Sequence, residues 1–202
     1  MSRAPASRAE QIAIAVAIAA LMGFGIYGFA ADSPSTIGYL VAITVLGALV
    51  LWFRTAPLPG PLAIGLAVDA AAVLAGGLVN VGNDVLFNAS IGPRDTALHT
   101  HILQYDHLVH AFGSFVGTLA LFTLLAPATA AGPARRNAIV LCMLAGIGLG
   151  GINEMIEFLA TIAHSGAHVG GYVNTGWDLV ANTIGAVGAV GVIRTLRPRA
   201  SA

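Results

Sequence analysis

Ionisable side chains recur inside long apolar stretches of this 202-residue chain. They stand in Tyr-Asp-His-Leu-Val-His at 105–110, in Asn-Glu-Met-Ile-Glu at 153–157 and in Trp-Asp at 177–178. Carboxylates and imidazoles without thiolates are ligands that suit Zn, Mn or Fe. We therefore take as candidate metal ligands Asp106, His107, His110, Glu154, Glu157 and Asp178.

Three of these residues are also the candidate catalytic groups. Glu157 or Asp178 would ligate the metal or act as a base, and His110 would be a ligand or a proton carrier. Two metal-binding signatures do not fit the chain: His-Glu-x-x-His is absent, and the Glu-x-x-His of di-iron bundles would need a histidine where Glu157 stands. The expected cofactor, a divalent metal, thus follows from residue types and their placement rather than from a signature motif.

The composition indicates what must position these residues. Hydrophobic residues make up 57% of the chain and charged residues 9%, whereas roughly a quarter of the residues of soluble globular proteins are charged. A water-soluble domain is therefore excluded, and membrane lipid is the expected surrounding. Nine basic and nine acidic residues give a formal net charge of zero, so no nucleic-acid partner is expected.

Apolar runs separated by turn signals predict an all-α, polytopic integral membrane protein with six transmembrane helices in a single domain, residues 1–202. The expected helices cover residues 11–31, 36–53, 61–87, 105–126, 137–163 and 177–196. The first run also has features of a cleavable secretory signal, with basic residues before it and Gly28-Phe29-Ala30 near its end. Its apolar core of about 19 residues exceeds the usual 7–15 of a signal, which favours a retained helix.

Arginine placement predicts the orientation, because short cytoplasmic loops carry the basic residues of membrane proteins. In a six-span arrangement Arg94 falls on one side and the other eight fall on the opposite side: Arg3, Arg8, Arg54, Arg135, Arg136, Arg194, Arg197 and Arg199. Both termini are therefore expected in the cytoplasm, as in a multi-pass protein of the bacterial plasma (inner) membrane.

Helical geometry places the polar side chains in one layer of the outer half of the membrane. At 100° per residue, Asp69, Gly76, Asn80 and Asn83 share one face of the third expected helix. Similar polar or small-residue faces recur on the last three expected helices, which carry the candidate ligands. The four carboxylates among the candidate ligands share this layer, and they cannot all remain ionised there without cations or protons between them. They are those of Asp106, Glu154, Glu157 and Asp178.

Simple packing is the alternative for part of this layer. Glycines four residues apart let helices approach closely, and Asn or Asp can hydrogen-bond across such a contact. We weigh this alternative most heavily for Asn80, Asn83 and Asn182, and evenly for Asp69, which stands alone in the inner half. The loops above the layer add two weaker histidine pairs, His99 with His101 and His164 with His168.

The pattern in the second half of the chain, about residues 105–190, resembles the YjdF-like inner-membrane family. The shared elements are Tyr-Asp with a His four residues after the Asp, Glu-x-x-Glu before an aromatic residue, and Trp-Asp leading to Gly-Ala. The resemblance marks Asp106, His110, Glu154, Glu157 and Asp178. The family's Gly-Thr-Gln-Gly-Asp approach to Trp-Asp is replaced by Gly171-Tyr172-Val173-Asn174-Thr175-Gly176.

A more distant similarity to VanZ-like membrane proteins lies in Asp106 to His110 and in Asp178-x-x-x-Asn182-x-x-Gly185. Neither resemblance implies a known reaction. The leading hypothesis is a metal-assisted enzyme or binding protein that acts on a lipid or envelope component. The alternatives are a proton- or cation-coupled carrier and a non-catalytic scaffold subunit, and the sequence leaves the oligomeric state open.

Overall fold

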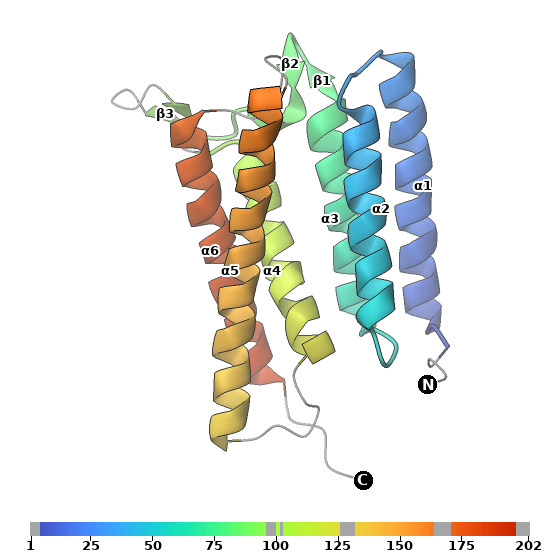
Figure 1. The fold of residues 1–202 in the computed structure, drawn as a ribbon, viewed down its shortest axis with the longest axis vertical. Coiled ribbons are helices and arrows are strands. Elements are labelled where there is room, and N and C mark those ends of the chain that lie inside the picture. The colour runs from blue at the N-terminus through green and yellow to red at the C-terminus, as the bar shows by residue number, and fades with distance from the viewer. Residues whose placement is uncertain (1–4, 96–99, 102, 126–131, 164–170, 197–202) are drawn as a thin grey trace.

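The computed structural model describes residues 5–95, 100–101, 103–125, 132–163 and 171–196 (Figure 1). Six helices in this part of the chain are long and apolar enough to cross a membrane. They are α1 (Arg8–Ala30), α2 (Thr36–Phe53), α3 (Gly60–Leu78), α4 (Tyr105–Leu125), α5 (Gly132–Ala163) and α6 (Tyr172–Thr195). The predicted all-α, six-span membrane architecture is confirmed.

The helices form two groups of three that meet along α3 and α4 (Figure 1). In one group α1 runs along α3, and α2 packs against both. In the other, α4 and α6 pack together most extensively, and α5 lies against both of them. The four helices that carry the candidate ligands and Asp69 are therefore neighbours in space.

Small residues allow the close approach of α4 and α6. A Cβ at Gly185 of α6 would overlap the carbonyl oxygen of Ala111 and would lie 3.0 Å from the backbone nitrogen of Phe115. Because these atoms belong to the backbone of α4, they cannot yield without moving the helix. The position of the candidate ligands depends on this contact, because both α4 and α6 carry some of them.

Gly185→Ala is therefore expected to destabilise the protein by about 1–3 kcal/mol, the usual cost of overpacking. Gly191→Ala is the matched control on the same helix, because nothing lies within 4 Å of a Cβ added there. Thermal unfolding in detergent measures both variants. Equal melting temperatures for the two would show that the α4–α6 contact is looser than the structure has it.

The third predicted helix, 61–87, was wrong in its last part, because α3 ends at Leu78. The chain then forms a hairpin of two short strands, β1 (Asn80–Val81) and β2 (Asp84–Val85), followed by the 3-10 helix η1 (Leu86–Asn88). Gly82 at the turn has a φ of +65°. Glycine takes this conformation without steric cost, and it suits a two-residue hairpin turn.

This hairpin removes two residues from the predicted polar layer. Asn80 and Asn83 lie beyond the end of α3 instead of on its face. An apolar run of 27 residues thus conceals a turn, because Val81, Val85 and Leu86 are as apolar as the residues of a helix. A second pair of short strands, β3 (Arg94–Asp95) and β4 (Thr100–His101), lies between η1 and α4.

Candidate functional site

The site begins in the first turns of α4. Asp106 and His110 stand four residues apart on the same face, and His110 Nε2 lies 3.3 Å from Asp106 Oδ1. A carboxylate in the first turn of a helix is favoured by the helix dipole. Asp106 is 8% exposed, so this pair lies inside the helix bundle.

His110 is the centre of the site, with carboxylates from three helices around its ring. Its Nδ1 lies 3.4 Å from Glu154 Oε1 of α5. Its Nε2 lies 3.9 Å from Glu157 Oε1, also of α5, and 3.9 Å from Asp178 Oδ1 of α6. The structure thus brings these predicted residues together from three helices.

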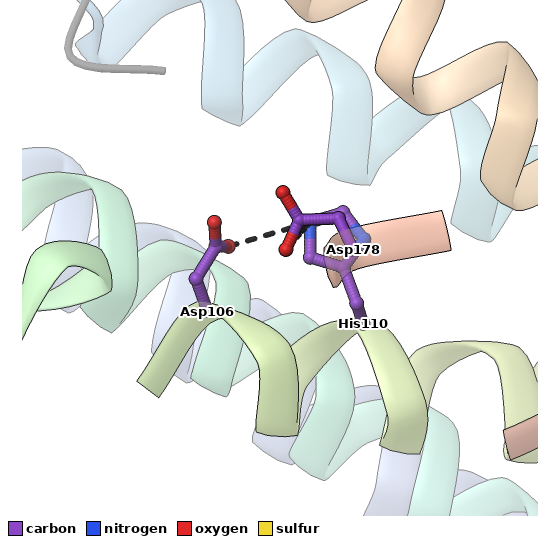
Figure 2. A group of neighbouring side chains, drawn as sticks. All are labelled: Asp106, His110 and Asp178. Carbon is purple, nitrogen blue, oxygen red and sulfur yellow. Dashed lines mark ion pairs between the residues drawn. The ribbon is translucent and has the colours of Figure 1, made fainter. Parts of the chain in front are cut away.

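Two overlapping sets of side chains have the dimensions of a metal site. One is Asp106, His110 and Asp178, shown in Figure 2, and the other is His110, Glu154 and Glu157. Within each set, one ligand atom from each residue lies within 4.8 Å of the others. Ligands about 2.0–2.2 Å from a common ion are at most about twice that distance apart, so small movements would bring either set around an ion.

Two carboxylates of the site are buried, and in each of them at least one oxygen accepts no hydrogen bond among the described residues. Asp178 is fully buried and its Oδ1 accepts no hydrogen bond among the described residues. Glu154 is 5% exposed, and neither of its carboxylate oxygens accepts one there. A buried charge is costly unless it is paired and hydrogen-bonded, so a cation or a proton would stabilise this arrangement.

Asn174 is a site residue that the sequence analysis missed. Its Nδ2 donates to Asp106 Oδ2 at 3.2 Å and to Asp178 Oδ2 at 2.7 Å. The helix was expected to begin at 177, but α6 begins at Tyr172, which turns Asn174 toward the carboxylates. The spacing of four between Asn174 and Asp178 was the available signal, and the adjoining Thr175 and Gly176 obscured it.

His107 lies beside the site but belongs to neither of the two ligand sets that the described residues form. The backbone N–H of Gln104 donates to His107 Nδ1 at 3.1 Å. His107 Nε2 therefore carries the proton of a neutral ring and lies 3.7 Å from Asp178 Oδ1. At this distance the contact between His107 and Asp178 is electrostatic and not a hydrogen bond.

Comparison with known families agrees with this architecture. The family described as "Predicted membrane protein (DUF2238)" matches residues 10–199, nearly the whole chain. The chain belongs to this family. The YjdF-like resemblance is consistent with that assignment. No curated protein and no solved structure matches the chain.

In this DUF2238 member the polar layer extends toward α3. Asp69 stands against Gly113 of α4, with its Oδ1 3.1 Å from the position of a Cβ there. That oxygen is buried and accepts no hydrogen bond within the described part of the chain. The sequence suggested that Asp69 stands alone in the inner half of the membrane. In the structure Asp69 lies against α4, about one helical turn beyond His110 in the direction away from the hairpin.

Asn182 supports the packing alternative that the sequence analysis weighed. Ser114 Oγ of α4 donates to Asn182 Oδ1 of α6 at 2.7 Å. A Cβ at Gly150 of α5 would overlap the side chain of Asn182. This contact of α4, α5 and α6 closes the site on the side away from the hairpin.

The loop histidines remain predictions. His99, His164 and His168 lie outside the described residues, and His101 is described only through the backbone of β4.

Proposed function

We propose that the protein holds a divalent cation, Zn, Mn or Fe, in an outward-facing site within the membrane. The proposal is carried by one observation: two three-residue ligand sets share His110 and draw their side chains from α4, α5 and α6. The function that such a site supports best is that of a metal-assisted enzyme or binding protein acting on a lipid or envelope component. Such an ion would polarise a bound substrate or activate water.

The roles that we assign to these residues follow from how deeply each one is buried. Asp106, His110 and Asp178 are the more enclosed set and would hold the ion, with Asn174 fixing the two aspartates. Glu157 is 27% exposed, so it is the carboxylate best placed to reach a substrate and act as a base.

Metal analysis of the purified protein tests this proposal. We expect near-stoichiometric Zn, Mn or Fe, and a rise in melting temperature when that metal is returned after chelation, because a ligand that binds only the folded state stabilises it. A well-folded protein that holds no metal and is not stabilised by any of the three would overturn the proposal. The remaining hypotheses for the function would then be a proton relay and a scaffold.

A location in the bacterial inner membrane with both termini cytoplasmic is part of the proposal. Arginines whose side chains the structure describes stand at the start of α1, the end of α2, the start of α5 and the end of α6. In the up-and-down bundle these four points share one end, opposite the hairpin (Figure 1). The positive-inside rule assigns that end to the cytoplasm, and the candidate site then faces outward.

Labelling of single cysteines tests this orientation. In a Cys142→Ser background, which removes the only cysteine, an impermeant maleimide should label Ser35→Cys at the start of α2 in intact cells. It should label Thr55→Cys, just after α2, only after permeabilisation. Both positions are exposed, so the reverse pattern would show that the site faces the cytoplasm.

Asp69 favours a proton- or cation-coupled carrier as the second candidate function. It lies inward of His110 and is in electrostatic range of it. Carriers need polar groups across the membrane, and Asp69 would be the first step inward. Under this alternative, Asp69→Asn would abolish ion flux in vesicles but leave metal content unchanged. The family comparison does not show the VanZ-like similarity, and that resemblance favours neither function.

A further inference from the structure

One side chain holds an oxygen of each of the two aspartates in the candidate site. Asn174 Nδ2 donates to Asp106 Oδ2 at 3.2 Å and to Asp178 Oδ2 at 2.7 Å. Asn174 is 7% exposed and stands in the first turn of α6, one turn before Asp178. A single amide group, with its two N–H donors, therefore joins a carboxylate of α4 to a carboxylate of α6.

The other oxygens of these two aspartates face the ring of His110. Asp106 Oδ1 lies 3.3 Å from His110 Nε2, and Asp178 Oδ1 lies 3.9 Å from the same nitrogen (Figure 2). Asp178 is fully buried, and its Oδ1 accepts no hydrogen bond among the described residues. A buried carboxylate oxygen without a partner is costly, so an ion that binds these three atoms would stabilise them.

The two glutamates of α5 are placed differently with respect to His110 Nε2. Glu154 Oε1 lies 3.4 Å from His110 Nδ1, the other ring nitrogen. A histidine that binds a metal usually donates its other ring N–H to a carboxylate, and Glu154 has the position for that role. Glu157 Oε1 lies 3.9 Å from Nε2, but it accepts a hydrogen bond from Asn153 Nδ2 at 2.6 Å. An ion on Nε2 therefore has two aspartate oxygens and one nitrogen as its protein ligands.

Asn174 and the burial of the site limit the coordination number of such an ion. Because Asn174 holds both Oδ2 atoms, each aspartate offers the ion one oxygen, Oδ1. Asp106 is 8% exposed and the side chain of His110 is 9% exposed, so few water molecules can reach the ion from outside. Three protein ligands and one further position for water or substrate give a four-coordinate site.

Four-coordination separates the three candidate metals. Catalytic zinc sites have three protein ligands and an open fourth position. Octahedral oxygen sites are typical of Mn, and a facial triad with two histidines is typical of non-haem Fe(II), whereas this ligand set has one histidine. Ligands at the corners of a tetrahedron about 2.0 Å from zinc lie about 3.3 Å apart. Asp106 Oδ1 and His110 Nε2 have this separation, 3.3 Å.

We propose that the ion is zinc, held by Asp106, His110 and Asp178 with its fourth position open, and that Asn174 selects zinc by restricting each aspartate to one oxygen. This inference rests on the proposed metal site and names its metal and the residue that selects it. Asn174 does not contact the ion and is a positioning residue. The open position makes the site catalytic in type, because structural zinc sites have four protein ligands.

Replacement of the native metal by Co²⁺ in the purified full-length protein tests the coordination number. The geometry of a transition-metal site is diagnostic, and Co²⁺ absorbs visible light strongly when it is four-coordinate but weakly when it is six-coordinate. We expect the strong absorption in wild type. Asn174→Ala frees both Oδ2 atoms for the ion, so the absorption should fall toward that of a six-coordinate site.

The affinities for Zn²⁺ and Mn²⁺, measured separately by isothermal titration, test the selection. Asn174→Ala should lower the affinity for Zn²⁺ by about 10–100-fold, as for other outer partners of metal ligands, and leave the affinity for Mn²⁺ unchanged or higher. Asn182→Ala is the matched control. It removes another buried asparagine of α6, whose side chain accepts a hydrogen bond from Ser114, and it should keep the Co²⁺ spectrum and the ratio of the two affinities.

The other outcomes decide against the proposal. A six-coordinate Co²⁺ spectrum in wild type would overturn the zinc assignment and leave a metal site for Mn or Fe, and this spectrum decides the point even if Asn174→Ala fails to fold. A well-folded wild type that binds neither Co²⁺ nor any of the three metals would overturn the proposed function as well. Equal losses of Zn²⁺ and Mn²⁺ affinity in Asn174→Ala, with an unchanged Co²⁺ spectrum, would show that Asn174 supports the fold and does not select the metal.

Discussion

Replacement of His110 by alanine is expected to lower the affinity for the proposed metal ion by more than about 100-fold, because loss of an outer partner of a metal ligand alone costs about 10–100-fold. His110 is the residue that the two ligand sets share. Its Nε2 and Nδ1 face carboxylates of different helices. No other described side chain can take its place between Asp106 and Glu154.

His107→Ala is the matched control, because it removes the other histidine of α4. Its Nδ1 accepts the Gln104 backbone N–H and its Nε2 faces Asp178, so its loss should weaken binding only about tenfold. Isothermal titration with the metal found in wild type compares the two variants, with helicity as the check on folding. Equal losses would contradict the central place of His110, and a larger loss in His107→Ala would make His107 the ligand.

Replacement of Arg54 by leucine is expected to cost about 3–5 kcal/mol of stability, the usual result of removing one partner from a buried ion pair. Arg54 Nε lies 3.2 Å from Glu10 Oε1, and the two side chains are 11% and 2% exposed. The pair joins the start of α1 to the end of α2. Ser7 caps the same turn of α1, accepting from the Glu10 backbone N–H at 3.2 Å.

The double variant Glu10→Leu with Arg54→Leu should recover most of this loss, because it leaves no buried charge. Arg136→Leu on α5 is the control for the change of residue type, since Arg136 is exposed and should change stability by less than about 0.5 kcal/mol. Chemical unfolding in detergent measures the three variants. A double variant as unstable as Arg54→Leu would show that packing, and not the charge, accounts for the effect.

The sequence determined the class of this protein and most of the site. Apolar runs longer than a membrane is thick can form little other than spanning helices, because no water satisfies the backbone there. Ionisable residues are rare in such runs, so each one is conspicuous. For that reason Asp106, His110, Glu154, Glu157 and Asp178 could be selected without knowledge of the helix packing.

Where helices begin and end was less determined, because apolar residues suit a short hairpin as well as a helix. The turn at Gly82 ended α3 early and took Asn80 and Asn83 out of the layer. The early start of α6 brought Asn174 in. Both differences arise from backbone conformations at helix ends, where composition gives little signal.

Only the tertiary structure decided which side chains face one another. Helical periodicity fixes the direction of a side chain relative to its own helix, but not which neighbour lies opposite. The contact of α3 with α4 places Asp69 against Gly113, and the position of His107 behind Asp178 follows from the packing of α4 on α6. The pairing of Glu10 with Arg54 likewise needs α1 and α2 side by side, because a long-range contact is set by how helices pack and not by the spacing within either one.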